Sequence, residues 1–376
     1  MTGLFTRSRL AALIIVCVLL QPTHAAPPLP ALGADLTGLT VSGVSSGGQM
    51  AVQFQVAHSR LVQGVGVIAG GPYYCAEGSI WQALTSCMSP SSWAPLPAAE
   101  ELRARAETVA RSGRIDPLAG LRDDRVWLFS GGQDTVVKPP VMDSLAAFYS
   151  SWLPPEAIQY VKRADAAHAM ISVADPQANA CGSSQTPYIN RCGDFDAAGQ
   201  LLAHLLGPLQ APATAGGDTV SFDQQPFVTG KAIDASLADE AYLHVPHVCR
   251  QVACRIHVVF HGCRQSTAQI GRRFVDRAGY KRWANSNRLL ILYPQTTPRH
   301  GPGWGSWTWI NNPFGCWDWW GYSGPDYHTR DGAQIKAVRA MLERLAAPRE
   351  PFSQPAGDRG SDNGARRQDE RPRILP

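Results

Sequence analysis

The sequence predicts an α/β protein with one mostly parallel sheet flanked by helices. Short apolar runs of strand length alternate along the chain with longer segments of helical character, a pattern typical of α/β folds. No internal repeat is visible in the 376 residues, and we expect a single domain rather than an array of modules.

The first half of the predicted domain alternates strands and helices around glycine-rich turns. We expect its strands at 38–44, 62–70, 124–134 and 157–170, the last two running into loops. The segments 47–61, 141–152 and 196–206 are predicted to be helices.

A Pro/Ala/Gly-rich connector at 207–218 separates this half from the second. Beyond it we expect strands at 240–246, 255–262 and 288–295, with a helical segment at 266–287 between the last two. The final helix should begin near Asp331, which stands three residues before Gln334 at the spacing of a capping box.

The two ends of the chain differ in composition from the rest. Residues 1–25 combine a basic start, an apolar run of about eleven residues and a small-residue cleavage site, which indicates an export signal. A retained membrane anchor is the alternative, although so short a run does not span a bilayer comfortably. The stretch 347–376 is rich in Pro, Gly and charge and is predicted to be disordered. The folded domain should therefore occupy 26–346, in a secreted or periplasmic protein without membrane association once the signal is removed.

Cysteine usage supports an exported protein. Cys17 lies within the predicted signal, which leaves eight cysteines. An even set in an exported chain favours disulfides. The sequence has no CxxC pair and no histidines at ligand spacing, so no metal site is expected. Eight cysteines allow 105 connectivities. Closeness in sequence suggests the pairs Cys75–Cys87, Cys181–Cys192 and Cys249–Cys254, which leaves Cys263–Cys316.

The charge of the chain is nearly balanced. There are 34 Lys and Arg, including Arg7 and Arg9 of the predicted signal, against 30 Asp and Glu. This balance gives no electrostatic reason to expect nucleic acid or anionic lipid as a partner. Charged residues make up only 17% of the chain, and we expect a rigid extracellular monomer with an aromatic surface.

The turn VSGVSSGGQM at 41–50 contains the pattern Gly-x-Ser-x-Gly centred on Ser45. In a nucleophile elbow the serine lies on a tight turn between strand and helix, and the next N–H becomes an oxyanion donor. Centring the pattern on Ser46 would put Val44 where glycine is expected. Ser45 is therefore the predicted nucleophile, with Ser46 supplying a backbone N–H. A Gly/Ser-rich turn without a catalytic role is the alternative.

A nucleophilic serine needs a histidine as base and an acid that orients the histidine, which together form a catalytic triad. In α/β-hydrolases the acid and then the histidine follow the serine in the sequence. Asp134 comes directly after an apolar strand, and His168 follows the next strand. His58 lies thirteen residues along the elbow helix, roughly 20 Å from Ser45 at 1.5 Å per residue. Asp165 and Asp175 flank His168 in sequence and are the rival acids. The non-catalytic alternatives are that Asp134 only shapes a turn and that His168 only forms hydrogen bonds with the backbone.

The second oxyanion donor normally comes from a His-Gly loop after an earlier strand. The run RIHVVFHGC at 255–263 has this form, which makes the Cys263 N–H the candidate donor. Here the run follows His168 instead of preceding the nucleophile, and so does the apolar run at 288–295. A circular permutation accounts for the late position of both runs. The N- and C-termini of the usual fold are joined through the connector at 207–218, and new termini are opened just before the nucleophile strand. The predicted fold is thus a circularly permuted α/β-hydrolase.

Seven segments together carry a resemblance to a known family. They are VSGVSSGGQMA, IAGGPYYCA, FSGGQDTVV, HVVFHGCRQS, IGRRFVDRAGYKRWA, LILYPQ and NPFGCWDWWGY. Over roughly 37–346 the chain resembles single-domain poly(3-hydroxybutyrate) depolymerases of the circularly permuted type. The resemblance implies a secreted or periplasmic carboxylic-ester hydrolase acting on polyhydroxyalkanoate, with Ser45, Asp134 and His168 as triad and the N–H groups of Ser46 and Cys263 as oxyanion donors.

The resemblance also matches Trp319 to an aromatic residue lining the family's polymer crevice. Trp307 and Trp317 belong to the same stretch, 301–320, which contains six of the eleven tryptophans. We expect these rings to bind polyester by burying its methyl and methylene groups. Ordinary core packing is the alternative for each ring. Only a polar tail follows the catalytic region, so any adsorption to polymer should use the catalytic domain's own surface.

The expected reaction is a two-step acyl transfer through Ser45, without metal or organic cofactor. A feruloyl or other small-ester esterase with the same triad is the nearer alternative. A non-catalytic polymer- or glycan-binding protein that uses the tryptophan surface is the farther one.

Overall fold

The computed structural model describes residues 26–230, 232–303 and 309–349. The predicted export signal at 1–25, residues 350–376 of the predicted tail at 347–376, and the candidate Trp307 lie outside the described residues.

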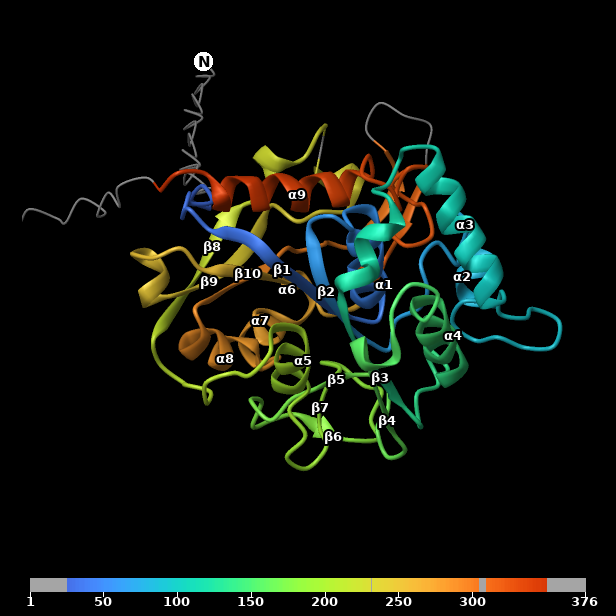
Figure 1. Cartoon of the computed structure of the whole chain (residues 1–376), viewed down its shortest axis with the longest axis horizontal. Coiled ribbons are helices and arrows are strands. Elements are labelled where there is room, and N and C mark those ends of the chain that lie inside the picture. The colour runs from blue at the N-terminus through green and yellow to red at the C-terminus, as the bar shows by residue number, and fades with distance from the viewer. Residues whose placement is uncertain (1–25, 231, 304–308, 350–376) are drawn as a thin grey trace, which may run out of the picture.

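An eight-stranded sheet forms the centre of the molecule, in the order β4-β3-β2-β1-β10-β11-β9-β8 (Figure 1). Its first six strands run parallel, and the last two pair antiparallel at one edge. The strands are β4 (Ile158–Arg163), β3 (Arg125–Gly131), β2 (Val62–Ile68), β1 (Asp35–Val44), β10 (Arg255–Phe260), β11 (Leu289–Tyr293), β9 (Glu240–Pro246) and β8 (Gly217–Asp223). The predicted mostly parallel sheet is confirmed.

The position of β10 shows the rearranged chain order. β10 pairs in parallel with β1, with Gly43 opposite Phe260, although more than two hundred residues separate them. The strand that ends at the nucleophile turn thus lies between the strand that follows it and a strand from the second half of the chain. The loops after β1 and β10 consequently meet at the same edge of the sheet.

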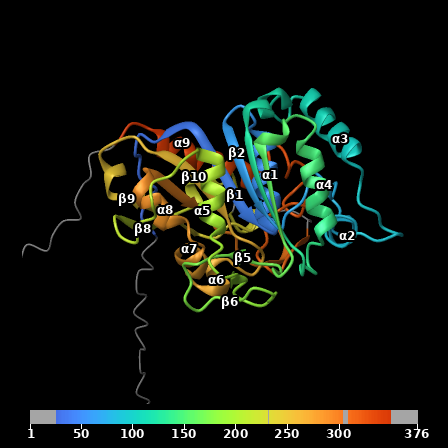
Figure 2. The same ribbon diagram turned by 60° about the horizontal axis from the view of Figure 1, so that its bottom comes forward.

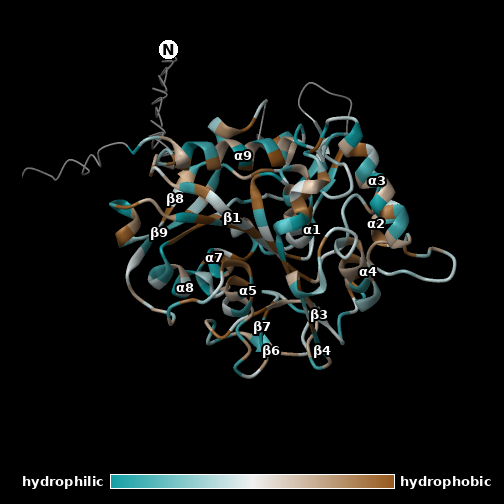
Figure 3. Cartoon of the chain, in the orientation of Figure 1, coloured by the Kyte–Doolittle hydropathy of each residue, from teal (hydrophilic) through white to brown (hydrophobic). Residues whose placement is uncertain are grey.

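Helices cover both faces of the sheet (Figures 1 and 2). One apolar core contains residues of α1 (Ser46–Ala57), α3 (Ala99–Arg111), α4 (Pro139–Tyr149) and α9 (Ala333–Ala346). The core of the opposite face contains residues of α5 (Ala197–Leu206), α7 (Arg273–Arg277) and α8 (Tyr280–Asn287). Neighbouring residues of one strand serve different faces, as the pleat requires: Val258 packs in the first core and Val259 in the second. Figure 3 shows the apolar residues concentrated on the central strands.

Glycines divide the segment 266–287, which the sequence predicts as one helical stretch, into three short helices. They are α6 (Thr267–Ile270), α7 and α8. Gly271 follows α6 with φ of 59°, and Gly279 precedes α8 with φ of 99°. Such left-handed backbone angles suit glycine and interrupt a right-handed helix.

Several smaller elements carry no clear sequence signal. β8 begins inside the expected connector, and its alternating exposed residues pair only with β9 at the sheet edge. α3 and the short α2 (Ile80–Leu84) were also not expected. Two smaller sheets accompany the main one. The first has three strands, in the order β5 (Met170–Ile171), β7 (Ile189–Arg191) and β6 (Asn179–Ala180). The second pairs β12 (Arg299–Pro302) with β13 (Trp309–Asn312).

The predicted capping box at Asp331 is wrong. Gly332 is the N-cap of α9, and no side chain caps the helix. Gln334 is buried, and its side chain accepts from the Asp318 N–H at 2.9 Å and donates to the Ala235 carbonyl at 2.6 Å. Asp331 instead lies 3.4 Å from the Lys336 ammonium.

All four expected disulfides are present, and they close Cys75–Cys87, Cys181–Cys192, Cys249–Cys254 and Cys263–Cys316. In the part of the chain that the structure describes, no helix has the length and hydrophobicity needed to cross a bilayer.

Candidate active site

Ser45 occupies the sharp turn between β1 and α1. Its φ of 57° and ψ of −121° are unusual for a residue with a side chain. The Ser45 N–H donates to the Ile68 carbonyl at 2.9 Å, and the Ser45 carbonyl accepts from the Gln49 N–H at 3.0 Å. These bonds hold a strained residue in place, as in a nucleophile elbow.

The two glycines of the predicted elbow are required by close backbone approaches. A Cβ atom on Gly43 would lie 2.1 Å from the Gly47 carbonyl oxygen. A Cβ on Gly47 would lie 2.3 Å from the carbonyl oxygen of Phe260, at the end of β10. Only glycine fits at either position, so the pattern centred on Ser45 has the steric cause that the sequence suggested.

Asp134 and His168 form a buried pair beside the elbow. Asp134 follows β3 and His168 follows β4, and the His168 Nδ1 lies 2.7 Å from the Asp134 Oδ2. The other carboxylate oxygen, Oδ1, accepts from the N–H groups of Val136 and Val137 at 2.9 and 2.8 Å. Asp134 is 4% exposed and His168 5%. The carboxylate is therefore fixed from one side by the backbone and directs the imidazole from the other.

The rival acids have other partners. Asp165 lies 2.7 Å from the Arg163 guanidinium, which lowers the pKa of this exposed carboxyl. Asp175 is buried and lies 2.8 Å from Arg273. His58 caps the far end of α1, where its ring packs 5.0 Å from that of Phe54. None of the three lines the cavity that opens over Ser45.

The N–H groups of Ser46 and Cys263 are free to meet an oxyanion. Among the described residues, neither donates a hydrogen bond to the protein. The two residues come from adjoining elements, since Ser46 begins α1 and Cys263 follows β10. Two amides without a protein acceptor suit the negative charge that develops on a carbonyl oxygen during acyl transfer.

Gln265 fixes the loop that carries Cys263, a role that the sequence did not suggest. Its Oε1 accepts from the Gly262 N–H at 2.8 Å. Its Nε2 donates to the carbonyls of Pro187 and Tyr188 at 3.0 and 2.9 Å. Gln265 is 1% exposed. The side chain therefore ties the loop after β10 to the loop that carries Tyr188 past the pocket.

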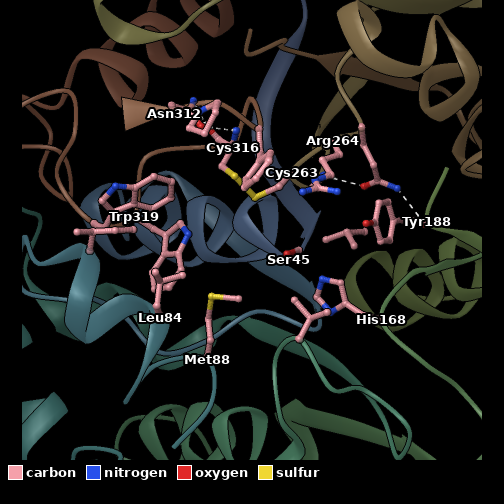
Figure 4. A pocket seen from close by; sticks show the side chains of 18 of the residues that line it. Ser45, Leu84, Met88, His168, Tyr188, Cys263, Arg264, Asn312, Cys316 and Trp319 are labelled. Carbon is pink, nitrogen blue, oxygen red and sulfur yellow. Dashed lines mark hydrogen bonds between the residues drawn. A yellow bond between two sulfur atoms is a disulfide. The ribbon is translucent and has the colours of Figure 1, made fainter. Parts of the chain in front are cut away.

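A cavity of about 450 Å³ opens over Ser45 and His168 (Figure 4). Its walls are mainly apolar, and its titratable side chains among the described residues are His168, Tyr188 and Arg264. α2 contributes Ile80 and Leu84, and the loop after β13 contributes Phe314. The remaining lining residues are Val44, Met88, Val136, Tyr188, Gly262, Cys263, Gln265, Asn311, Asn312, Pro313, Cys316, Trp319 and Trp320.

The tryptophans of this region divide into two groups. Trp319 lines the cavity as expected, and Trp320, which the sequence did not single out, lines it too. The expectation that Trp317 contacts substrate is wrong, because its ring is fully buried. It packs 4.9 Å from the ring of Phe260 and 5.7 Å from that of His261, beneath the loop after β10.

A buried carboxylate shapes the turn that presents Trp319 and Trp320. The Asp318 Oδ1 accepts from the backbone N–H groups of 320–322 at 2.7 to 3.2 Å, and Oδ2 accepts from the N–H and hydroxyl of Ser323. Burial raises the pKa of Asp318, and these donors oppose that rise. The turn is joined to the elbow as well, since the Ser46 hydroxyl accepts from the Trp317 N–H at 3.2 Å.

The described residues contain no group of three or more histidine, cysteine or acidic side chains placed to hold a metal ion. The arrangement that is present, a serine on a strained turn, a carboxylate–imidazole pair and two free amides, suits acyl transfer from an ester to water.

Comparison with known proteins identifies relatives over most of the chain. No family model matches the sequence. The "Poly(3-hydroxybutyrate) depolymerase" of Delftia acidovorans is 39% identical over 374 residues, covering 96% of this chain and 71% of the relative. The "Polyhydroxybutyrate depolymerase" of Talaromyces funiculosus is 35% identical over 335 residues, covering 86% of this chain and 94% of the relative.

Solved structures with the same fold include the crystal structure of PHB depolymerase from Penicillium funiculosum. It superimposes with a TM-score of 0.76 at 31% identity, covering 85% of this chain and 98% of that one. A variant PHB depolymerase complexed with an R3HB trimer matches with the same TM-score, identity and coverage.

Proposed function

The chain belongs to the poly(3-hydroxybutyrate) depolymerase family, and from this premise we propose that it hydrolyses the ester bonds of poly(3-hydroxybutyrate) or another short-chain polyhydroxyalkanoate. The observation that carries the proposal is the buried Asp134–His168 pair, whose histidine lines the same cavity as Ser45. Relatives that are named for this activity cover 86% or more of the chain.

Acylation begins when the His168 imidazole takes the proton of the Ser45 hydroxyl. The serine oxygen attacks the ester carbonyl, and the N–H groups of Ser46 and Cys263 stabilise the negative oxygen. The protonated imidazole then gives its proton to the leaving alcohol as the ester bond breaks. Asp134 keeps the proton of the neutral imidazole on Nδ1, which leaves Nε2 able to accept the serine proton, and it stabilises the charged ring.

Deacylation repeats these steps with water. His168 takes a proton from a water molecule, the resulting hydroxide attacks the acyl-enzyme, and Ser45 leaves with the proton that His168 returns. The products are a shorter chain or a hydroxy acid, and no cofactor takes part. One chain supplies every group that this scheme uses, and we propose that the protein acts as a monomer.

The apolar cavity suits a polyester chain, whose repeating unit is a methyl-bearing hydrocarbon between ester groups. Trp319 and Trp320 bury such groups, each buried methylene contributing about 0.8 kcal/mol. Exposed apolar residues continue from the cavity onto the surface, with Leu84 50% and Phe314 46% exposed. Trp81, which is 71% exposed on α2, extends this surface. We assign adsorption to solid polymer to this surface.

We also propose that the protein works outside the cytoplasm. Four disulfides need an oxidising compartment to form and persist. The sequence of residues 1–25 supplies the export signal.

Product analysis after incubation with an amorphous poly(3-hydroxybutyrate) suspension tests the proposal. The wild-type protein should clear the suspension and release 3-hydroxybutyrate or its oligomers, and Ser45→Ala should release neither. Release of ferulate from feruloyl esters without release of hydroxy acid would replace the proposal by the esterase alternative. Adsorption to the polymer without release of any acid would indicate a binding protein.

A further inference from the structure

Arg264 is the one permanently charged side chain among the described residues that line the cavity. It follows Cys263 directly, so it is next to the residue whose N–H is the proposed oxyanion donor. Figure 4 shows it on the same side of the cavity as Cys263 and Tyr188. The role proposed for Ser45, Asp134 and His168 leaves this positive charge unexplained.

The guanidinium of Arg264 is held in place and has free donors. It lies 4.1 Å from the centre of the Phe314 ring. Within the described part of the chain, its side chain forms no ion pair and no hydrogen bond. A guanidinium that lies against an aromatic ring keeps its in-plane N–H groups available, and its fork of donors matches a carboxylate.

The backbone of Arg264 is strained to produce this placement. Its φ is 61°, a left-handed value that is unfavourable for a residue with a side chain. The Arg264 N–H donates to the Phe314 carbonyl at 2.8 Å, and the Cys263–Cys316 disulfide fixes the same two segments. Glycine or asparagine would occupy such a position more easily. Strain of this kind, kept next to a reacting centre, points to a functional side chain.

We infer that Arg264 binds the carboxylate at the end of a hydroxyalkanoate oligomer. The inference rests on the proposed function and specifies its substrate. In the proposed reaction the acyl part remains on Ser45, whereas the leaving alcohol carries the carboxyl end of the chain. A carboxylate held by Arg264 therefore belongs to the leaving segment. It stays ionised throughout, and the only proton that moves to this segment is the one that His168 gives to its alkoxide.

No competing charge in the cavity opposes this binding. The described lining residues include no acidic side chain, and Asp134 lies buried behind His168. An anionic chain end therefore meets one cation at the mouth of an apolar cavity. Because Arg264 is exposed, the charge-assisted hydrogen bond stays in contact with water and is sensitive to salt. The inference predicts that oligomers with a free carboxylate are better substrates than the same oligomers with a neutral end.

The test compares the 3-hydroxybutyrate trimer as free acid with its methyl ester at low ionic strength. For the wild type we expect kcat/KM to be about five- to tenfold higher for the acid, the range of one partly exposed charge-assisted pair. Arg264→Gln should bring this ratio to about one, and Arg264→Lys should leave it between the two. Arg111→Gln removes an exposed arginine on α3, remote from the cavity, and should keep the wild-type ratio.

Salt provides a measurement that needs no variant. Raising ionic strength should lower the acid-to-ester ratio of the wild type, because the added ions screen a partly exposed pair. A wild-type ratio of one, or a ratio that Arg264→Gln leaves unchanged, would overturn the inference while leaving the depolymerase activity in place. If the wild type cleaves neither trimer nor polymer, the proposed function fails and the inference fails with it.

Discussion

The Nδ1 atom of His168 lies 2.7 Å from the Oδ2 atom of Asp134, and both side chains are almost completely buried. The two residues are 34 positions apart in the sequence. Each follows one of two neighbouring parallel strands, β3 and β4, and the carboxyl ends of these strands bring the side chains together. The opposite carboxylate oxygen is held by two backbone amides. This geometry distinguishes Asp134 from the acidic residues that lie nearer to His168 in sequence.

Asp134→Asn should lower kcat by about 10³- to 10⁴-fold, because the amide preserves the shape of the pair but favours the wrong imidazole tautomer. The matched variant Asp165→Asn, which alters an exposed carboxylate paired with Arg163, should keep near-wild-type turnover. Steady-state hydrolysis of a soluble 3-hydroxybutyrate oligomer measures both. A large loss in Asp165→Asn with turnover retained in Asp134→Asn would reverse the assignment.

Gln265→Met should lower kcat by about ten- to a hundredfold with a smaller change in KM, since misplacing one oxyanion donor costs less than the 10²- to 10³-fold of removing it. The methionine fills the same space but makes none of the three bonds to Gly262, Pro187 and Tyr188. Affinity for a phosphonate transition-state analogue should fall in parallel with kcat. Gln177→Met, an exposed substitution, is the control. Equal affinity for the analogue in Gln265→Met and wild type would show that the side chain does not position the donor.

Replacing Cys263 and Cys316 together by serine should cost about 4 kcal/mol of unfolding free energy, because the bridge closes a loop with a sequence separation of 53. Activity should fall as well, since the bridge joins the Cys263 loop to the turn that presents Trp319. Serine at both Cys249 and Cys254, whose separation is 5, should cost only about 2 kcal/mol and preserve kcat. Denaturant unfolding and oligomer hydrolysis give the two readouts. Equal losses of activity in both double variants would contradict the proposed link.

Gly47→Ala should abolish activity and destabilise the protein by about 3 kcal/mol or more, because the new Cβ meets the Phe260 carbonyl at 2.3 Å and backbone must move. Gly113→Ala is the matched variant. Gly113 has a positive φ of 74° but open space around it, so its substitution should cost only about 1 kcal/mol. Thermal unfolding compares the two, and equal, small costs would show that the close approach at Gly47 is not required.

His257 should make the folded protein less stable in acid. It is fully buried between the Thr40 and Ser42 hydroxyls, and burial lowers its pKa to about 3 from an ordinary value of 6.5. Between these values the unfolded chain binds the proton and the folded protein does not, so stability is lost as pH falls below 6.5. Between pH 6 and 4, His257→Gln should reduce the slope of unfolding free energy against pH by about 1.4 kcal/mol per unit. Identical slopes for variant and wild type would contradict this.

The elbow and the carboxylate–histidine pair could be predicted because each depends on signals that are local in sequence. Gly43 and Gly47 are required within one turn, and Asp134 and His168 each follow an apolar strand. The order of the strands was recoverable for the same reason, since the His-Gly loop after β10 is recognisable wherever it occurs in the chain.

Features that depend on distant packing could not be predicted in this way. Gln265 acts on carbonyls 77 and 78 residues away, and nothing in its neighbourhood signals these bonds. Trp317 stands in a stretch with cavity-lining tryptophans but is buried against Phe260, so composition alone assigned it wrongly. β8 was missed because an edge strand with alternating exposed residues lacks an apolar run.

The most direct test of the account is the site of covalent labelling by a serine-reactive phosphonate ester, located by mass spectrometry of the digested protein. The account predicts a single adduct on Ser45, formed in step with loss of ester hydrolysis and absent from Ser45→Ala. An adduct on Ser46 or on any other serine, or full hydrolytic activity in Ser45→Ala, would contradict it.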